Sequence, residues 1–330
     1  MKTKSPAKGD MLMLLLTIYV LTIKLVVQPI LLPTLGIDVY SGIGRVIFFY
    51  GILAVTLFIP FVFYLLFTKQ KPTDALLLKI PSTKNILLSV ALGIALIPIM
   101  ILCITLLSIL RSLIFPSVDM DIVATAPSLG AVIIFGAVFA SVFEEIWFRG
   151  IIYDQYHGHR QGASIGKTAL VTSLFFGLMH GDIVQVSYAI PIGMILAYLL
   201  YYTRSIWIPI TTHFVINALS LSLNFIDTPE SSYAQNYVSV YGDYYYQAAD
   251  GMLAMVVLFG GASLVMIPAV ILCLKKFKKY HATNLLNEKT SSNTIETVET
   301  KTKGFSWIFW TVTVIWTVII LLREFGVIGL

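Results

Sequence analysis

The sequence LGAVIIFGAVFASVFEEIWFR, residues 129–149, decides the fold class of this chain. Its apolar run, Leu129–Phe143, ends directly in Glu144 and Glu145. About twenty mostly apolar residues are enough to cross a bilayer as an α-helix. A charged side chain at bilayer depth costs roughly 3 kcal/mol on insertion scales. We therefore interpret this stretch as a membrane-spanning helix whose carboxylates are present for a functional reason.

The composition of the whole chain extends this interpretation. Of its 330 residues, 58% are hydrophobic and 12% are charged, whereas soluble domains have about 45–50% apolar and about 25% charged residues. The apolar residues form runs of roughly twenty, so we predict an all-α, polytopic transmembrane bundle of about nine spans in the cell membrane. The expected spans are 11–32, 43–67, 86–110, 128–150, 166–181, 184–202, 206–225, 252–274 and 305–322.

Basic residues in the connections predict the orientation of the chain. If the spans alternate, every basic cluster falls on one side, which places the N-terminus in the cytoplasm. The connection 226–250 carries acidic residues and no Lys or Arg, and it falls on the external side. The basic clusters are Lys2, Lys4 and Lys8; Lys69, Lys71, Lys79 and Lys84; Arg160 and Lys167; Arg204; and Lys275, Lys276, Lys278 and Lys279.

The net charge of +5 does not indicate nucleic-acid binding, because the basic residues lie in short clusters beside apolar runs. The lipid bilayer is the expected partner. Cys103 and Cys273 lack the spacing of a metal or redox site. We divide the chain into N-terminal transmembrane helices 1–127, a core 128–225, an external loop 226–250, a transmembrane helix 251–274, a solvated cytoplasmic linker 275–304 and an appended C-terminal transmembrane helix 305–330.

Polar residues at helical spacing mark a candidate site within the core. Glu145 and Arg149 are four residues apart, so they share a helix face and can form a bidentate ion pair. Glu144 lies about 100° round the helix and is left free to act. His213 and Asn217 are also four residues apart, and two polar groups on one face suit the binding of a developing oxyanion.

His180 ends the fifth apolar run, at Phe176-Gly177-Leu178-Met179-His180. The chain turns back between the fourth and fifth spans, so we expect His180 beside Glu144 on antiparallel helices.

These patterns resemble, in order and spacing, the three motifs of the CAAX-protease and bacteriocin-processing family of intramembrane peptidases, also called CPBP or Abi proteins. The motifs are Glu144-Glu145-x-x-x-Arg149, Phe176-x-x-x-His180 and His213-x-x-x-Asn217, and the resemblance covers about residues 128–220. The resemblance implies that Glu144 activates the attacking water with His180 beside it. It also implies that His213 and Asn217 stabilise the oxyanion, while Glu145 and Arg149 support the site.

The resemblance leaves several alternatives open. It implies a glutamate mechanism without a cofactor, but Glu144, His180 and His213 also form a plausible ligand set for zinc, even though the HExxH pattern is absent. The expected substrate is a membrane-associated or lipidated peptide, cut near the cytoplasmic face. A non-catalytic bacteriocin-immunity or scaffold protein is the second hypothesis. A proton-coupled transporter is the third, although no inverted repeat supports it.

Four other ionisable residues are expected to have no role in the site. Lys24 interrupts the first span near its end, where a lysine side chain usually snorkels to the headgroups. His157 and His159 belong to a polar turn, and His281 belongs to the predicted linker. We expect all three histidines to be exposed.

Overall fold

The structure is a computed structural model, and it describes residues 6–31, 34, 36, 54–69, 71, 73, 76–115, 130, 133–157, 164–223, 249–291 and 306–327. The predicted external loop 226–250 lies outside these residues as far as position 248. Within the described residues the regular structure is helical, and extended pairing is limited to a single bridge between Leu78 and Ser205. The predicted all-α membrane bundle is confirmed.

The helices follow one another along the chain, and η denotes a π-helical segment. Their bounds are α1 (Pro6–Thr22), η1 (Ile23–Leu31), η3 (Ala54–Phe58), α4 (Ile59–Thr68), α6 (Thr83–Ile114), η4 (Ile133–Phe139), α8 (Ala140–Glu145), η5 (Ile146–Ile152), α9 (Tyr153–His157), α10 (Ile165–Leu178), α11 (Ile183–Thr203), α12 (Trp207–Leu223), α14 (Ala249–Ser291) and α15 (Trp307–Glu324).

Length and composition identify the membrane-crossing helices. Among the described residues, five helices are long and apolar enough to cross a membrane: Gly9–Val27, Thr83–Ile114, Ile183–Thr203, Leu253–Asn284 and Trp307–Glu324. The apolar helices Thr56–Thr68, Ile165–Leu178 and Trp207–Leu223 are shorter. Each predicted span overlaps one of these helices or the composite helix 133–157, so the protein is a multi-pass membrane protein.

Side-chain caps fix where several helices begin. Ser82, Ser164, Asp182 and Ser306 each accept a hydrogen bond from the backbone N–H three residues later, which satisfies one of the unpaired donors of the first helical turn. Asp182 forms the shortest of these bonds, 2.7 Å from the N–H of Gln185. It therefore starts α11 directly after the turn that follows α10.

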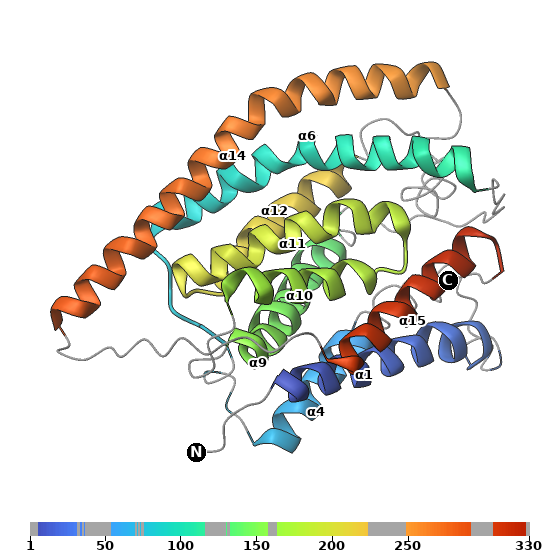
Figure 1. Cartoon of the computed structure of the whole chain (residues 1–330), viewed down its shortest axis with the longest axis horizontal. Helices are drawn as coiled ribbons and strands as arrows, with labels where there is room; N and C mark the ends of the chain where they lie inside the picture. The colour runs from blue at the N-terminus through green and yellow to red at the C-terminus, as the bar shows by residue number, and fades with distance from the viewer. Residues whose placement is uncertain are drawn as a thin grey trace.

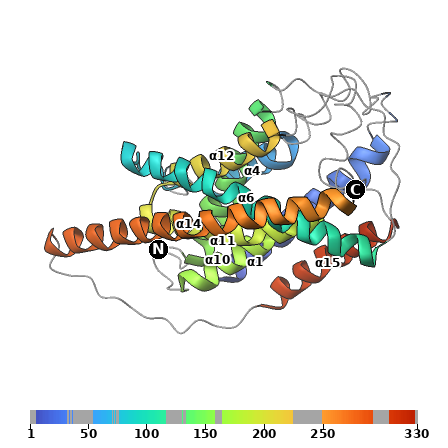
Figure 2. The same ribbon diagram turned by 90° about the horizontal axis from the view of Figure 1, so that it is seen from above.

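Helix α14 is longer than predicted. The segment 275–304 was expected to be a solvated linker, but α14 continues through it as far as Ser291. No Pro or Gly interrupts residues 275–291, and Lys, Leu and Glu favour a helix there. The extension is also anchored, since Phe277 is fully buried. Helix α14 packs along α6 on the outside of the bundle (Figure 1, Figure 2).

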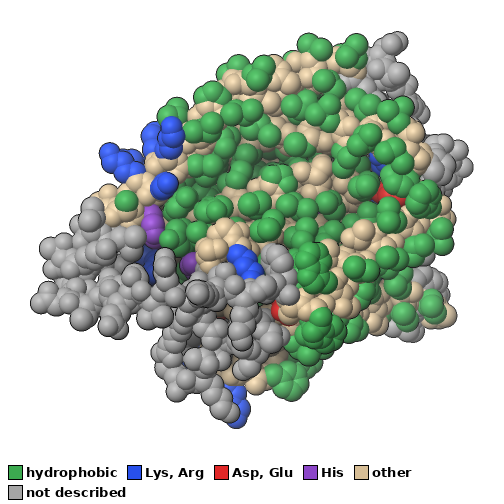
Figure 3. Space-filling view, viewed as in Figure 1, with side chains coloured by type: hydrophobic (Ala, Val, Ile, Leu, Met, Phe, Trp, Pro, Cys, Tyr) green, Lys and Arg blue, Asp and Glu red, His purple; other side chains and the backbone are tan. Residues whose placement is uncertain are grey.

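The helix ends gather into two groups, as alternating spans require. At one end the contacts join Asp10 to Tyr156, Lys79 to Ser205, and Tyr201 to His281. At the other end they join Lys24 to His180, Arg323 to Asp182, and Arg111 to Glu324. In the view of Figure 3, Lys and Arg gather mainly at the left end, and hydrophobic side chains cover most of the face. That the first group faces the cytoplasm stays a prediction.

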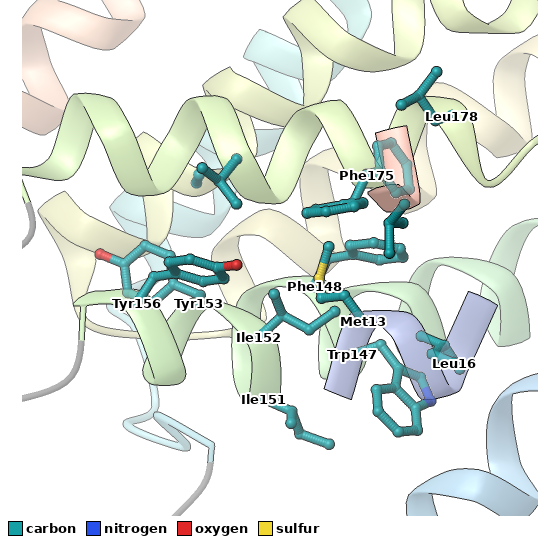
Figure 4. Close-up of a cluster of buried hydrophobic side chains, with 14 of the residues drawn as sticks. Met13, Leu16, Trp147, Phe148, Ile151, Ile152, Tyr153, Tyr156, Phe175 and Leu178 are labelled. Carbon is teal, nitrogen blue, oxygen red and sulfur yellow. The ribbon is translucent and has the colours of Figure 1, made fainter. Parts of the chain in front are cut away.

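The main core is formed by side chains from α1, η5, α9 and α10 (Figure 4). Met13 and Leu16 from α1 lie near Trp147 and Phe148 from η5 there. The indole N–H of Trp147 donates to the carbonyl of Leu57 at 2.7 Å, which ties this core to η3.

The last helix is part of the bundle rather than appended to it. On α15, Trp316 is fully buried and donates to Thr17 of α1 at 3.1 Å. The ring of Phe309 packs edge-on against Phe175 of α10, with 5.4 Å between centroids. Helix α15 therefore packs against both α1 and α10.

Candidate active site

The two adjacent glutamates lie where a composite helix changes its winding. Helix α8 ends at Glu145, and the wider turns of η5 begin at Ile146. The side chain of Glu145 is 0% exposed and that of Glu144 is 19% exposed. One carboxylate is thus enclosed by protein, and its neighbour is accessible. Local π-helical turns are frequent at functional sites.

Glu145 and Arg149 form the predicted ion pair inside the bundle. One terminal nitrogen of Arg149 lies 2.8 Å from Glu145 Oε1, and both side chains are 0% exposed. The expected bidentate geometry was wrong, because the other terminal nitrogen donates to the carbonyl of Gly193 at 3.0 Å. The guanidinium also lies 4.6 Å from the ring centroid of Phe176. Arg149 therefore connects η5, α10 and α11 as well as neutralising Glu145.

His213 lies between the two carboxylates. Its Nδ1 is 2.9 Å from Glu145 Oε1, and its Nε2 is 3.6 Å from Glu144 Oε2. A carboxylate accepts hydrogen bonds, so Nδ1 carries the proton of this contact, and Nε2 is directed towards Glu144. As predicted, Arg149 forms its ion pair with Glu145 and not with Glu144. The ionisable neighbour of Glu144 is the imidazole from α12, which sequence spacing alone does not reveal.

The charges of this cluster leave room for one exchangeable proton. When His213 is neutral, Glu144 and Glu145 carry two negative charges and Arg149 carries one positive charge. One further proton, held by His213 Nε2 or by Glu144, makes the cluster neutral. The two groups lie 3.6 Å apart, longer than a direct hydrogen bond, and such a pair beside a reacting water is suited to general acid and base chemistry.

His180 packs against Phe176, an aromatic ring that also contacts His213. Its Nδ1 is 2.7 Å from the carbonyl of Phe176, and its ring packs edge-on against Phe176 with 5.0 Å between centroids. The same Phe176 ring meets His213 at 5.7 Å. In the described part of the chain, no hydrogen bond or ion pair joins His180 to Glu144. The Phe176 ring contacts both histidines, and the expected position of His180 beside Glu144 stays a prediction.

Asn217 faces the segment that precedes the glutamates. Its Nδ2 is 3.4 Å from the carbonyl of Gly136 and 3.4 Å from the hydroxyl of Ser141, which is fully buried. Both contacts are long for hydrogen bonds. Since Asn217 lies one helical turn beyond His213, its amide group remains on the same side of α12 as the carboxylate cluster.

Gly193 is a site residue that the sequence did not reveal. A Cβ atom built on Gly193 would lie 3.0 Å from the Arg149 guanidinium and 3.0 Å from Ser173 Cβ. Only glycine lets the backbone of α11 approach closely enough for its carbonyl to accept from Arg149. The residue stands in an ordinary apolar run, so nothing local distinguishes it from other helix glycines.

Lys24 contacts the turn that carries His180. It was expected to snorkel to the headgroups, but its ammonium donates to the backbone carbonyl of His180 at 3.3 Å. The signal that could have found it is the interruption of an apolar run by a lone charge.

The polar-segment histidines were also expected to be exposed, and two of them are not. The ring centroid of His157 lies 5.4 Å from that of Tyr201, and that of His281 lies 4.6 Å from the same ring. Both histidines are of intermediate burial. The physical reason is that the extension of α14 brings His281 against α11. His159 lies outside the described residues.

The zinc alternative requires Glu144, His180 and His213 to converge. Among the described residues, no group of three His, Cys, Asp or Glu side chains is arranged to hold a metal ion. The Phe176 ring contacts both histidines, and the Nδ1 atom of each is engaged by another group. The need for zinc is decided by the chelator experiment proposed below.

Comparisons with known proteins match the segment that carries these residues. The family model described as "Type II CAAX prenyl endopeptidase Rce1-like" matches residues 126–219. The chain is 28% identical over 98 residues to YdiL of Bacillus subtilis (strain 168), which is named as a candidate membrane peptidase. That match covers 30% of this chain and 38% of YdiL.

No solved structure matches the chain. All six predicted site residues lie inside the segment that the family model matches. Residues 126–219 of this chain therefore match the model of the Rce1-like CAAX prenyl endopeptidases, and the three sequence motifs lie inside that match.

Proposed function

We propose that this chain is an intramembrane endopeptidase that hydrolyses a peptide bond of a membrane-associated or lipidated substrate near the cytoplasmic membrane face. The observation that carries the proposal is His213, which contacts both carboxylates within the family segment. A scaffold or immunity protein has no need for a buried imidazole shared by two glutamates. The family description, a prenyl endopeptidase, supports a lipidated peptide as the substrate class.

Glu144 is the proposed general base. It is the partly exposed carboxylate of the pair, with a side chain 19% exposed against 0% for Glu145. A base must reach the water that it activates. Glu145 is enclosed by Arg149 and His213, so its proposed role is to orient the imidazole. In the reaction, Glu144 takes a proton from water as the oxygen attacks the carbonyl carbon, and the proton then passes to the leaving amine.

His213 and Asn217 are the proposed partners of the oxyanion. Both contacts of Asn217 Nδ2 are long and therefore weak. Little free energy is lost when the amide donates instead to a charged oxyanion, which is a stronger acceptor. His213 already donates from Nδ1 to Glu145, so its Nε2 can donate to an oxyanion only when the ring carries a second proton.

This requirement separates two possible roles of His213 by the sign of a pH dependence. As an oxyanion donor, the ring must carry a proton on both nitrogens, so turnover falls as the pH rises. As a base, it must be neutral, so turnover falls as the pH decreases. Because protonation of Glu144 also stops turnover at low pH, only a loss of kcat as the pH rises tests the oxyanion role of His213.

The decisive experiment is cleavage of a fluorogenic membrane peptide by the full-length protein in nanodiscs. Glu144→Gln keeps the shape of the side chain and removes the proton acceptor, so cleavage is expected to fall by about 10²–10⁴-fold. The midpoint of thermal unfolding should stay near that of the wild type. Full activity of Glu144→Gln rejects the assignment.

The same assay tests the two alternatives. A zinc enzyme loses activity to a strong chelator, recovers it with zinc and contains close to one ion per chain. A non-catalytic scaffold or immunity protein cleaves nothing under any condition. A screen of prenylated and unmodified membrane peptides against wild-type and Glu144→Gln protein identifies the substrate class.

Asn217→Ala tests the oxyanion site separately. Loss of one oxyanion donor costs about 10²–10³-fold in kcat. Substrate binding should be nearly unchanged, since the amide acts only once the tetrahedral intermediate forms. A change confined to KM would contradict the assignment.

A further inference from the structure

The α10–α11 turn, which carries His180, is held by cations from both terminal helices. Lys24 of η1 donates to the carbonyl of His180 at 3.3 Å. Arg323 of α15 donates to the carbonyl of Gly181 at 3.0 Å and to Asp182 Oδ2 at 2.8 Å. Three consecutive residues of the turn are thus bound by side chains that come from outside the family segment 126–219.

The geometry of the turn explains why it needs these partners. At the end of α10, the carbonyls of the last turn lack partners within the helix, and cations satisfy them well. Gly181 has a φ of +72°, which allows the chain to reverse within a few residues. A Cβ atom at Gly181 would lie 3.4 Å from Lys24 Nζ and 3.7 Å from Trp316, so the turn rests directly on both terminal helices.

Asp182 links the turn to the next helix. Its Oδ1 accepts from the N–H of Gln185 at 2.7 Å as the cap of α11, while its Oδ2 receives Arg323. The carboxylate is 5% exposed, against 29% for Arg323. One ion pair therefore fixes the start of α11 relative to the end of α15.

We propose that Lys24 and Arg323 are positioning residues that hold His180 in its working place. This inference rests on the proposed peptidase function. The carbonyl of Phe176 orients the His180 ring, while the backbone of His180 belongs to the turn. The position of the ring relative to the glutamates therefore depends on where the turn is held. Displacing a catalytic group by about 1 Å can cost about 10²-fold in rate. The terminal helices are therefore part of the catalytic unit.

The experiment compares Arg323→Gln and Lys24→Met with a matched control, Arg111→Gln. Arg111 forms an ion pair with Glu324, the residue next to Arg323, but it holds α15 to α6 rather than to the turn. We expect Arg323→Gln and Lys24→Met to lower kcat by roughly 10–100-fold with little change in KM. Arg111→Gln should keep kcat, and Lys24→Arg should restore most of the activity lost in Lys24→Met.

Combining Arg323→Gln with His180→Ala distinguishes positioning of His180 from a general loss of stability. In a His180→Ala background, Arg323→Gln should lower kcat no further, because the group that it positions is already absent. The proposal is overturned if the two losses in kcat are additive, or if kcat is unchanged in both Arg323→Gln and Lys24→Met.

A measurement without turnover keeps this inference separate from the proposed function. The chain has five histidines, so the ring resonances of labelled protein can be assigned by substitution. The His180 resonance should shift in Arg323→Gln and Lys24→Met but not in Arg111→Gln. If the wild type cleaves no peptide, the proposed function fails, but this comparison still tests whether Lys24 and Arg323 position His180. If the His180 resonance does not shift in Arg323→Gln and Lys24→Met, the inference is overturned whatever the activity.

Discussion

Glycine has opposite surroundings in the α10–α11 hairpin and in α14. A Cβ atom on Gly177 would lie 2.5 Å from Ile190, and one on Gly193 would lie 3.0 Å from Arg149. On α14, a Cβ atom at Gly260 or Gly261 meets nothing within 4 Å. The same residue type therefore permits close helix packing in the first region and simply occupies an open surface in the second.

Burial separates the two regions in the same way. In the most apolar stretch of α11, 44% of the residues are buried inside the protein, whereas in that of α14 only 17% are. The surface of α14 is consistent with contact to lipid, whereas the α10–α11 hairpin provides the backbone on which the site is built. Substitutions of equal size should therefore have large effects in the hairpin and small ones in α14.

The largest expected effect is in thiol labelling on the two sides of the membrane, where a cysteine either reacts or does not. It tests the direction in which α14 crosses the membrane. In a chain whose Cys103 and Cys273 are replaced by Ala, Ser232→Cys should react with an impermeant thiol reagent in intact cells. Ser291→Cys, at the far end of α14, should react only after permeabilisation. Labelling in the reverse order inverts the orientation.

Breaking the Glu145–Arg149 ion pair should give the largest change in the free energy of unfolding. Arg149→Ala leaves Glu145 buried without its cation and leaves the Gly193 carbonyl without its donor. We expect a loss of about 3–5 kcal/mol in the free energy of unfolding. Glu145→Gln should cost less, because the amide can still hydrogen-bond. Unfolding of both variants in mixed micelles measures the difference, and equal losses would contradict the prediction.

Gly193→Ala should have an intermediate effect, because the added methyl group overlaps the space between Arg149 and Ser173. Overpacking of this kind costs about 1–3 kcal/mol. Peptide cleavage should also fall, since Arg149 holds Glu145 and Glu145 holds His213. Wild-type stability together with wild-type turnover would show that α11 can move away at no cost.

Gly260→Ala is the matched substitution on α14, and it should have the smallest effect. The methyl group meets no neighbour, while alanine favours the helix by about 0.5–1 kcal/mol over glycine. The free energy of unfolding should therefore stay the same or rise slightly, with cleavage unchanged. A clear loss of stability would indicate that this face of α14 is covered in the assembled protein.

The fold could be predicted because its signals are local. Runs of about twenty apolar residues located the spans, and each predicted span overlaps a described helix. The prediction failed where hydropathy stops but helix formation continues, as in α14 beyond residue 274. A polar helix is stabilised there by Phe277 and His281, which pack on the bundle. Such docking depends on partners distant in sequence, so composition favoured a linker.

The sequence by itself determined the pairs that one helix turn brings together, because residues four apart share a face whatever surrounds them. Glu145 with Arg149 is such a pair, and the structure contains it. Only the tertiary structure decided that His213 joins the two glutamates, that Gly193 receives Arg149, and that Lys24 holds the carbonyl of His180. These contacts join different helices, and their geometry follows from how closely the helices pack, which no local spacing encodes.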